Sequence, residues 1–288
     1  MNAASAVELG ALGVVRIRGP DAARFLQGQL SNDVTRLERE PSLIAGFHNP
    51  QGRAIAVLRL AALAREDFLA ILPRELAAPV VARLQRLVLR AKVRLGDESG
   101  AWRVRGLTGS AAREAAVHIA LPGGVRALEV SAAAGSGDAA DSAPAEREAW
   151  TLQDIGSGLP QVYGATTESF VAQMLNLDLI DGVSFDKGCY TGQEVIARAH
   201  YRGRVKRRLQ RFRTLAPTRL APGDDGRLAD GRAFTVVEAA RHADGCCEFL
   251  AVAPLAVGGG EPHEPEASHP SGAVLAVETL SLPYPLPV

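Results

Sequence analysis

The sequence has few cysteines, and they show no pairing pattern. Three cysteines occur in 288 residues, and two of them, Cys246 and Cys247, are adjacent. This usage argues against a disulfide framework of the kind that holds small secreted domains together. The N-terminal residues also lack the basic segment and the long apolar run of a signal peptide. We therefore expect a cytoplasmic protein in a reducing compartment, where a free thiol can persist.

Long apolar runs and an excess of one charge are absent too. No stretch reaches the 18 or more apolar residues that cross a bilayer, so no membrane association is expected. The chain has 32 basic and 32 acidic residues, so binding to nucleic acid would need a local basic patch. Lysine is rare among the basic residues, because only Lys92, Lys187 and Lys206 are present.

Metal-ligating and phosphate-binding motifs are also missing. The segment 261–270 (EPHEPEASHP) has two histidines among three glutamates, but its prolines indicate an exposed loop and its spacing is poor for a metal. Without a Cys-x-x-Cys pair or a set of four ligands, we expect no stable iron–sulfur cluster held by the chain itself. No G-x-x-x-x-G-K loop is present, which argues against a nucleotide hydrolase. We predict no metal-binding residue.

The composition that is present, 47% hydrophobic and 22% charged, is that of a globular protein. The first half of the chain mixes short strands, hairpins and helices. Strands are predicted at 12–17, 54–63, 66–72, 91–97, 102–109 and 125–132, and helices at 73–91 and 110–120. Because the order is not a strict alternation of strand and helix, we predict an α+β fold with largely antiparallel sheets.

The second half of the chain differs from the first in composition and in the spacing of its predicted strands. Residues 131–146 (SAAAGSGDAADSAPAE) are small and polar, which predicts a loop or linker, and a short helix is expected at 150–155. After residue 205, short β-like runs alternate with Gly, Pro and Asp clusters, a pattern typical of a small β-barrel. The predicted domains are 1–205 and 206–288.

One short segment, 185–204 (FDKGCYTGQEVIARAHYRGR), places a cysteine before a predicted helix that starts at Thr191. Cys189 thus precedes a helix N-terminus, where the helix dipole and the nearby ammonium of Lys187 favour the thiolate. Gly188 and Gly192 permit a positive φ or the close approach of a ligand. The alternative is a buried, inert cysteine in a strand–turn–helix junction.

The motif KGCYTGQE, at 187–194, resembles the signature of the YgfZ family. That family shares a superfamily with the T-protein (aminomethyltransferase) of the glycine cleavage system. The resemblance extends over most of the chain, through GPDAARFLQGQLSNDVTRL, NPQGRAIAVLRL, FVAQMLNLDLIDGVSF and the terminal LPYPL. Ala172 departs from the family pattern, in which a proline is common at this position.

The resemblance implies a fold, a ligand and a role. The fold would be a folate-binding domain of intertwined ferredoxin-like units, followed by a small C-terminal β-barrel. The ligand would be tetrahydrofolate or another folate. The role would be in assembly or repair of iron–sulfur clusters, with iron–sulfur client enzymes or assembly proteins as partners, including enzymes that modify tRNA. Cys189 would be the functional thiol, assisted by Lys187.

The resemblance also implies which residues contact the folate. Trp150 matches a tryptophan linked to folate in bacterial relatives, although an ordinary core tryptophan is the plain alternative. Leu12 stands where some relatives carry another tryptophan, which would weaken one face of the folate slot. The remaining residues implied to contact the folate lie in the cysteine motif and the helix after it: Tyr190, Gly192, Gln193, Glu194 and Arg198.

Two other functions stay open at the sequence level. A one-carbon transferase resembling aminomethyltransferase would need the acidic pair of T-proteins, but Ala56 and Val57 stand at those positions, so this activity is disfavoured. An RNA-binding module could use the basic run 198–213, in which eight of sixteen residues are Arg or Lys and none is acidic. A solvated face, or an ion pair between Glu194 and Arg198, is the simpler explanation of this run.

Overall fold

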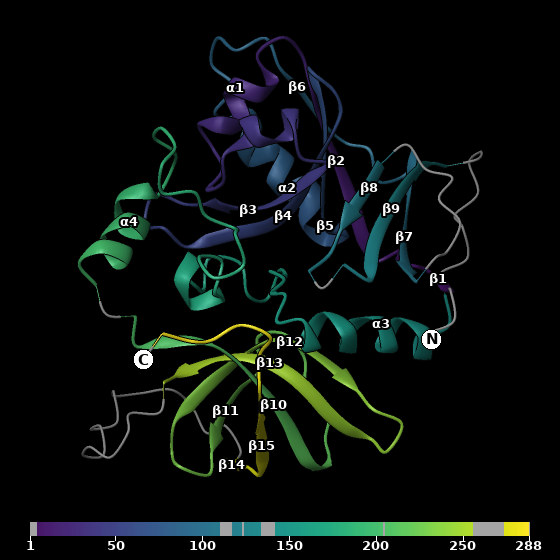
Figure 1. Ribbon diagram of the computed structural model, residues 1–288, viewed down its shortest axis with the longest axis vertical. Helices are drawn as coiled ribbons and strands as arrows, with labels where there is room; N and C mark the ends of the chain where they lie inside the picture. The colour runs from purple at the N-terminus through teal and green to yellow at the C-terminus, as the bar shows by residue number, and fades with distance from the viewer. Residues whose placement is uncertain are drawn as a thin grey trace.

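The computed structural model describes residues 5–109, 117–122, 124–133, 142–203, 205–255 and 274–287. Within these residues the chain forms three β-sheets with a few helices around them (Figure 1). Every strand pair is antiparallel except the pair of β11 and β14. The prediction of largely antiparallel sheets is therefore confirmed.

The first sheet has five strands and carries the main core. Its order is β3-β4-β5-β2-β6, formed by β2 (Leu12–Arg18), β3 (Ser42–His48), β4 (Ala54–Ala64), β5 (Asp67–Pro73) and β6 (Arg94–Asp97). Helix α2 (Arg74–Gln85) packs on β2, β5 and β6. Two shorter helices follow β2, namely α1 (Ala22–Gln27) and the 3-10 helix η1 (Val34–Glu38). The predicted hairpin is confirmed by the register of β4 and β5.

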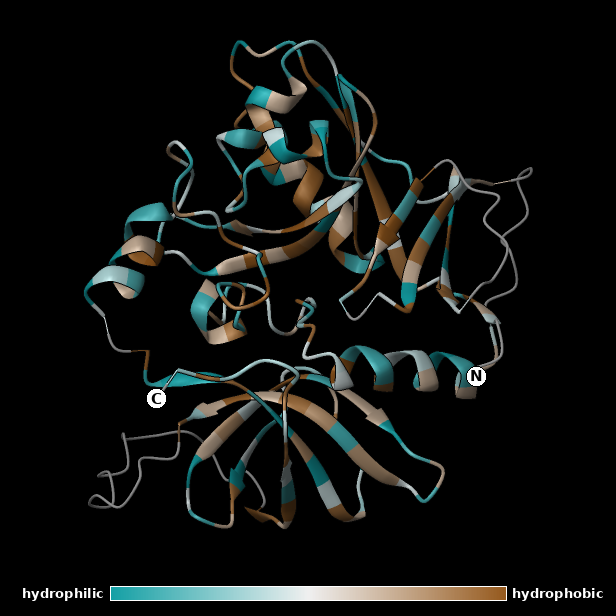
Figure 2. Ribbon diagram, viewed as in Figure 1, coloured by the Kyte–Doolittle hydropathy of each residue, from teal (hydrophilic) through white to brown (hydrophobic). Residues whose placement is uncertain are grey.

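A second sheet of four strands shares a hydrophobic cluster with the first. Its order is β1-β7-β9-β8, formed by β1 (Ser5–Glu8), β7 (Trp102–Thr108), β8 (Val117–Ala120) and β9 (Arg126–Ala132). Leu69 and Ile71 of the first sheet pack with Val104 and Leu128 of the second. Figure 2 shows hydrophobic residues (brown) along these strands.

The third sheet is nearly closed and barrel-like. Its order is β14-β11-β12-β13-β10-β15, formed by β10 (Arg207–Pro217), β11 (Asp225–Leu228), β12 (Ala233–Arg241), β13 (Cys246–Pro254), β14 (Val274–Leu275) and β15 (Val277–Leu280). Three buried phenylalanines, Phe212, Phe234 and Phe249, fill its centre. Helix α3 (Pro144–Gly156) packs against β12 and β13, and also touches β1 (Figure 1).

Some sequence-based boundaries were wrong. The predicted helix at 110–120 ends in a strand, β8, and residues 110–116 lie outside the described part. The pattern misled because Val117 and Ile119 point into the second core at the strand period of two, although the alanines around them favour helix. Helix α2 ends at Gln85, and Leu89 beyond it is 87% exposed.

Helix α3 begins at Pro144, inside the segment predicted as a loop. Much of that segment, 134–141, lies outside the described residues, as does the histidine-containing segment 261–270. No helix among the described residues is long and apolar enough to cross a membrane.

Candidate functional site

The cysteine motif forms a surface turn before helix α4 (Gln193–Tyr201). Cys189 is exposed and free, whereas Cys246 is half-buried and Cys247 is buried in the barrel core. Burial raises the pKa of the Cys247 thiol to about 11, which keeps it protonated at neutral pH. Cys189 is therefore the most accessible of the three thiols, so the alternative of a buried cysteine is wrong, while the reactivity of the thiol stays a prediction.

Lys187 fixes this turn to the body of the protein. Its Nζ donates hydrogen bonds to the backbone carbonyls of Gln27 (2.7 Å), Leu30 (2.6 Å) and Asn32 (2.9 Å). Burial lowers the pKa of Lys187 to about 8, and the carboxylate of Asp33 acts in the opposite direction. Because all three ammonium protons have carbonyl acceptors, Lys187 acts as a clamp on the loop. Its predicted effect on the thiol stays a prediction.

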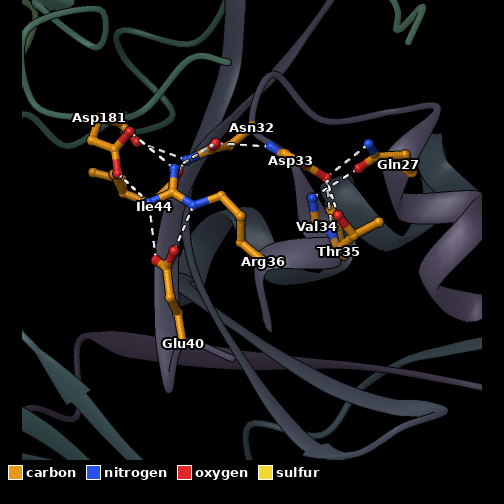
Figure 3. A network of polar contacts seen from close by, with 9 residues as sticks. All are labelled: Gln27, Asn32, Asp33, Val34, Thr35, Arg36, Glu40, Ile44 and Asp181. Carbon is orange, nitrogen blue, oxygen red and sulfur yellow. Dashed lines mark hydrogen bonds and ion pairs between the residues drawn. The ribbon is translucent and has the colours of Figure 1, made fainter. Parts of the chain in front are cut away.

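A polar network holds the carbonyls that Lys187 contacts (Figure 3). The side-chain amide of Asn32 donates to the carbonyls of Ile44 and Asp181. Arg36 bridges the carboxylates of Asp181 and Glu40. This network ties the turn after α1 to β3 and to the 177–182 segment. The Cys189 turn is consequently anchored to this network through Lys187 and the carbonyl of Asn32.

The start of α4 is held by two glycines. Gly192 has φ +83°, and a Cβ there would lie 2.6 Å from the carbonyl oxygen of Asn49 and 3.0 Å from Cα of Gly52. Gly52 itself has φ +72° in the β3–β4 turn. The helix start therefore packs backbone to backbone on that turn, which explains Gly192 without a ligand. Gly188 differs, because a Cβ there would have no atom within 4 Å.

The other predicted contacts lie around this turn. Tyr190 is buried, and Nζ of Lys187 lies 5.0 Å from its ring centroid. Gln193 is half-buried in the first turn of α4, while Glu194 and Arg198 are exposed. The described residues contain no ion pair between Glu194 and Arg198. Glu194 and Arg198 are thus exposed on the helix that follows Cys189, whereas Tyr190 is buried beneath the turn.

Trp150 lies elsewhere, on α3, and the structure does not bring it to Cys189 (Figure 1). The indole is buried against Gly106 of β7, where a Cβ would lie 2.5 Å from the ring. The guanidinium of Arg126 lies over the ring, 4.8 Å from its centroid. Arg126 in turn pairs with the carboxylate of Asp154 at 2.7 Å. Trp150 therefore packs in the second core beside a charged pair.

A buried polar centre shares Asp154 with this pair and also contains Arg59, Tyr163 and Glu238, of which Arg59 and Glu238 are buried and Tyr163 is half-buried. Tyr163 Oη donates to the Glu238 carboxylate at 2.5 Å. The pKa of Glu238 is raised to about 7, chiefly by burial and also by the charge of Asp154, although the hydrogen bond from Tyr163 and the charge of Arg59 act to lower it. Burial also raises the pKa of Tyr163 well above its usual value.

Sequence reasoning missed this centre. Its members come from β4, α3, the 157–171 segment and β12, so no local motif joins them. The one available signal was a glutamate, Glu238, within the otherwise apolar run AFTVVEAA.

His48 adds a buried titratable group to the face of β3 and β4 that carries Arg59. The His48 ring covers Gly46, and Gly46 pairs with Val57 of β4. Val57 and Arg59 are two residues apart on that strand, so their side chains lie on the same face of the sheet. Both ring nitrogens of His48 lack a hydrogen-bond partner among the described residues. Burial lowers the pKa of His48 to about 4. Ala56 and Val57 are fully buried, and because both side chains are apolar, neither position offers a carboxylate.

Among the described residues, no group of three or more His, Cys, Asp or Glu side chains could hold a metal ion.

No family model matches the chain. A protein of Edwardsiella ictaluri named "tRNA-modifying protein YgfZ" is 33% identical over 273 residues, covering 83% of this chain and 81% of the relative. The chain belongs to the YgfZ family. The YgfZ protein of Serratia proteamaculans is 30% identical over 263 residues, covering 81% of this chain and 79% of its own.

A solved structure shows the same overall fold. The glycine cleavage system aminomethyltransferase T from Bartonella henselae matches with a TM-score of 0.59 at 11% identity. The match covers 87% of this chain and 78% of that protein. The YgfZ chain therefore has the fold of the aminomethyltransferase.

Proposed function

We propose that this YgfZ family member is a cytoplasmic, folate-binding accessory protein that supports iron–sulfur enzymes, including those that modify tRNA. In this proposal the folate-binding domain spans 1–205 as intertwined ferredoxin-like units, and the barrel spans 206–288. The observation that carries the proposal is Cys189, an exposed thiol on a turn that a half-buried lysine and two glycines hold in place. The names of the relatives, "tRNA-modifying protein YgfZ", support the connection to tRNA.

The buried polar centre suits the polar part of a folate. A pterin ring presents N–H donors and a carbonyl acceptor, which the carboxylate of Glu238 and the guanidinium of Arg59 complement. The two ring nitrogens of His48 have no partner among the described residues, and buried groups of this kind usually find one in a ligand or water. A bound folate would supply one-carbon or redox chemistry, while the chain would bind and orient it. Trp150 would act through Arg126 and Asp154 rather than as an open stacking wall.

The thiol is tested in cells that lack their own gene of this family. We expect Cys189→Ser to fold but to abolish the iron–sulfur-dependent modification of tRNA, because serine cannot replace a thiol nucleophile or sulfur ligand. Cys246→Ser serves as the matched control on the barrel and should keep the modification. Tandem mass spectrometry of tRNA nucleosides measures the outcome. Full modification with Cys189→Ser would remove the thiol from the proposal.

The folate site is tested by calorimetric titration with tetrahydrofolate. We expect Glu238→Gln to weaken binding by about 1.5–3 kcal/mol, the usual contribution of a hydrogen bond to a charged group. Trp150→Ala should cost about 1–3 kcal/mol, and Trp102→Ala is its control, because Trp102 also packs near an arginine, Arg16, but outside this centre. Unfolding curves confirm that each variant is folded. Absence of binding by the parent protein would remove folate from the proposal.

A further inference from the structure

The α4 end of the molecule has exposed cations and an exposed aromatic ring that the proposed function does not explain. The basic run predicted from the sequence divides in two. Arg208 pairs with Asp178, Arg211 with Glu248 and Arg213 with Asp244. By contrast, Arg198, Arg202 and Lys206 are exposed, and no ion pair among the described residues involves them. The first group is thus neutralised within the protein, and the second remains available to an outside partner.

Three aromatic rings lie among these free cations. The rings of Phe185 and His200 are stacked with centroids 3.8 Å apart. The ring of Tyr201 stands at 73° to Phe185 and at 85° to His200. Tyr201 keeps 66% of its surface exposed despite these contacts. An aromatic side chain that is pre-oriented by its neighbours and left open is a platform on which a planar group can stack.

The charges and rings together define the α4 surface, which lies at the outer edge of the molecule (Figure 1). Its members are Phe185, Arg198, His200, Tyr201, Arg202 and Lys206. We propose that the α4 surface binds a single-stranded nucleic acid, with the three cations contacting phosphates and Tyr201 stacking on a base. Proteins that bind single strands combine these two features, a track of positive charge and exposed aromatic rings. Helix α4 rises about 1.5 Å per residue, so Tyr201 lies about 12 Å beyond the helix start near Cys189.

Two exposed acidic residues lie nearby: Glu194 in the first turn of α4, and Asp186 next to Phe185 in the chain. Both flank the Cys189 turn, whereas the cations begin at Arg198 and continue beyond the helix. The nucleic acid strand is therefore expected to follow the C-terminal half of α4, Arg202 and Lys206, rather than the turn with the thiol.

Fluorescence anisotropy with a labelled single-stranded RNA 12-mer tests the charges. The double variant Arg198→Gln/Arg202→Gln should reduce the slope of log K against log salt by about 1.4, because each lost phosphate contact contributes about 0.7 for single strands. The matched control is Arg86→Gln/Arg90→Gln, which removes two exposed arginines with the same spacing near the end of α2. This control should leave the slope unchanged. Equal slopes for both double variants would overturn the proposal.

The stacking role of Tyr201 is tested by comparing the RNA with an oligonucleotide that has no bases. Tyr201→Ala should raise the Kd of the RNA about fivefold or more while leaving the salt slope unchanged, and Tyr201→Phe should restore binding. An abasic oligonucleotide of equal length carries the same phosphates, so its weaker binding should not respond to Tyr201→Ala. An equal loss for both probes, or none for either, would overturn the assignment and leave the surface as a docking site for an acidic protein. The exposed position of Tyr201 makes misfolding of either variant a minor concern.

Discussion

At the scale of single residues, the structure gives several charged groups roles that their neighbours in sequence do not reveal. Lys187 follows an aspartate and precedes a glycine, yet its ammonium contacts three carbonyls more than 150 residues earlier in the chain. Glu238 lies in a strand of the barrel, yet its carboxylate meets Tyr163 and the charge of Arg59. Burial determines the protonation of both groups.

The buried carboxyl of Glu238 makes the stability of the protein depend on pH. Its pKa is about 7 in the folded protein and 4.5 ordinarily, so the folded state favours the neutral form. The penalty for ionising it is absent below pH 4.5, grows as pH rises, and is complete above pH 7, at about 3 kcal/mol. We expect Glu238→Gln to be more stable than the parent at pH 8 by up to that amount, and equal to it near pH 4.5. Urea unfolding at several pH values measures this difference.

His48 is a second buried titratable group, and its effect on stability changes with pH in the opposite direction. The stability of Glu238→Gln must therefore be compared with that of the parent protein at each pH. The pKa of His48 falls from 6.5 to about 4, so its contribution to stability is complete above pH 6.5 and is lost as pH falls toward 4. Subtracting the parent curve from the Glu238→Gln curve cancels His48, which both proteins contain. Parallel curves from pH 4.5 to 8 would show that the Glu238 carboxyl titrates normally.

At the scale of elements, the contact between α4 and the β3–β4 turn determines where the cysteine turn lies. Gly192 and Gly52 both have positive φ and face each other at close range. The buried Ile196 and the hydrogen bond from Gln173 Nε2 to its carbonyl hold the first turns of the helix. The thiol is thus positioned by a helix start, a hairpin turn and a lysine clamp.

Gly192→Ala tests this junction. The added methyl would lie 2.6 Å from the Asn49 carbonyl oxygen in a left-handed backbone conformation, so we expect a loss of about 1–3 kcal/mol in the free energy of unfolding. Gly188→Ala is the control, since it lies four residues earlier and has open space around it. This control should change stability by less than about 0.5 kcal/mol. Denaturant unfolding compares the two, and equal losses would mean that close packing does not explain Gly192.

At the scale of the whole molecule, several polar contacts join the barrel to the rest of the chain, including the three that follow. Arg208 and Asp178 form a buried ion pair, Tyr163 contacts Glu238, and the hydroxyl of Tyr284 in the terminal LPYPL segment donates to the Gly158 carbonyl at 2.7 Å. The overall fold is that of the aminomethyltransferase, but Ala56 and Val57 are buried and apolar in β4. The fold of the aminomethyltransferase is thus present without a carboxylate at positions 56 and 57.

We expect no aminomethyl transfer by the whole protein. Purified protein mixed with the other glycine cleavage components should release no methylene-tetrahydrofolate, because no carboxylate stands at 56 or 57 to handle a proton. A coupled absorbance assay measures the product, with an aminomethyltransferase in the same mixture as the positive control. Turnover at about one per second or faster would instead assign the chain to the transferases.

The sequence by itself determined the features that depend on neighbouring residues. The β4–β5 hairpin, the barrel strands β10, β12 and β13, and the helix after the cysteine motif follow from periodicity and turn residues, which act over a few positions. Only the tertiary structure decided that 117–120 is a strand, that Trp150 is covered by Gly106 and Arg126, and that the basic run divides into paired and free cations. These outcomes depend on burial and on partners distant in the sequence, because desolvation and ion pairing act on whichever groups the fold brings together.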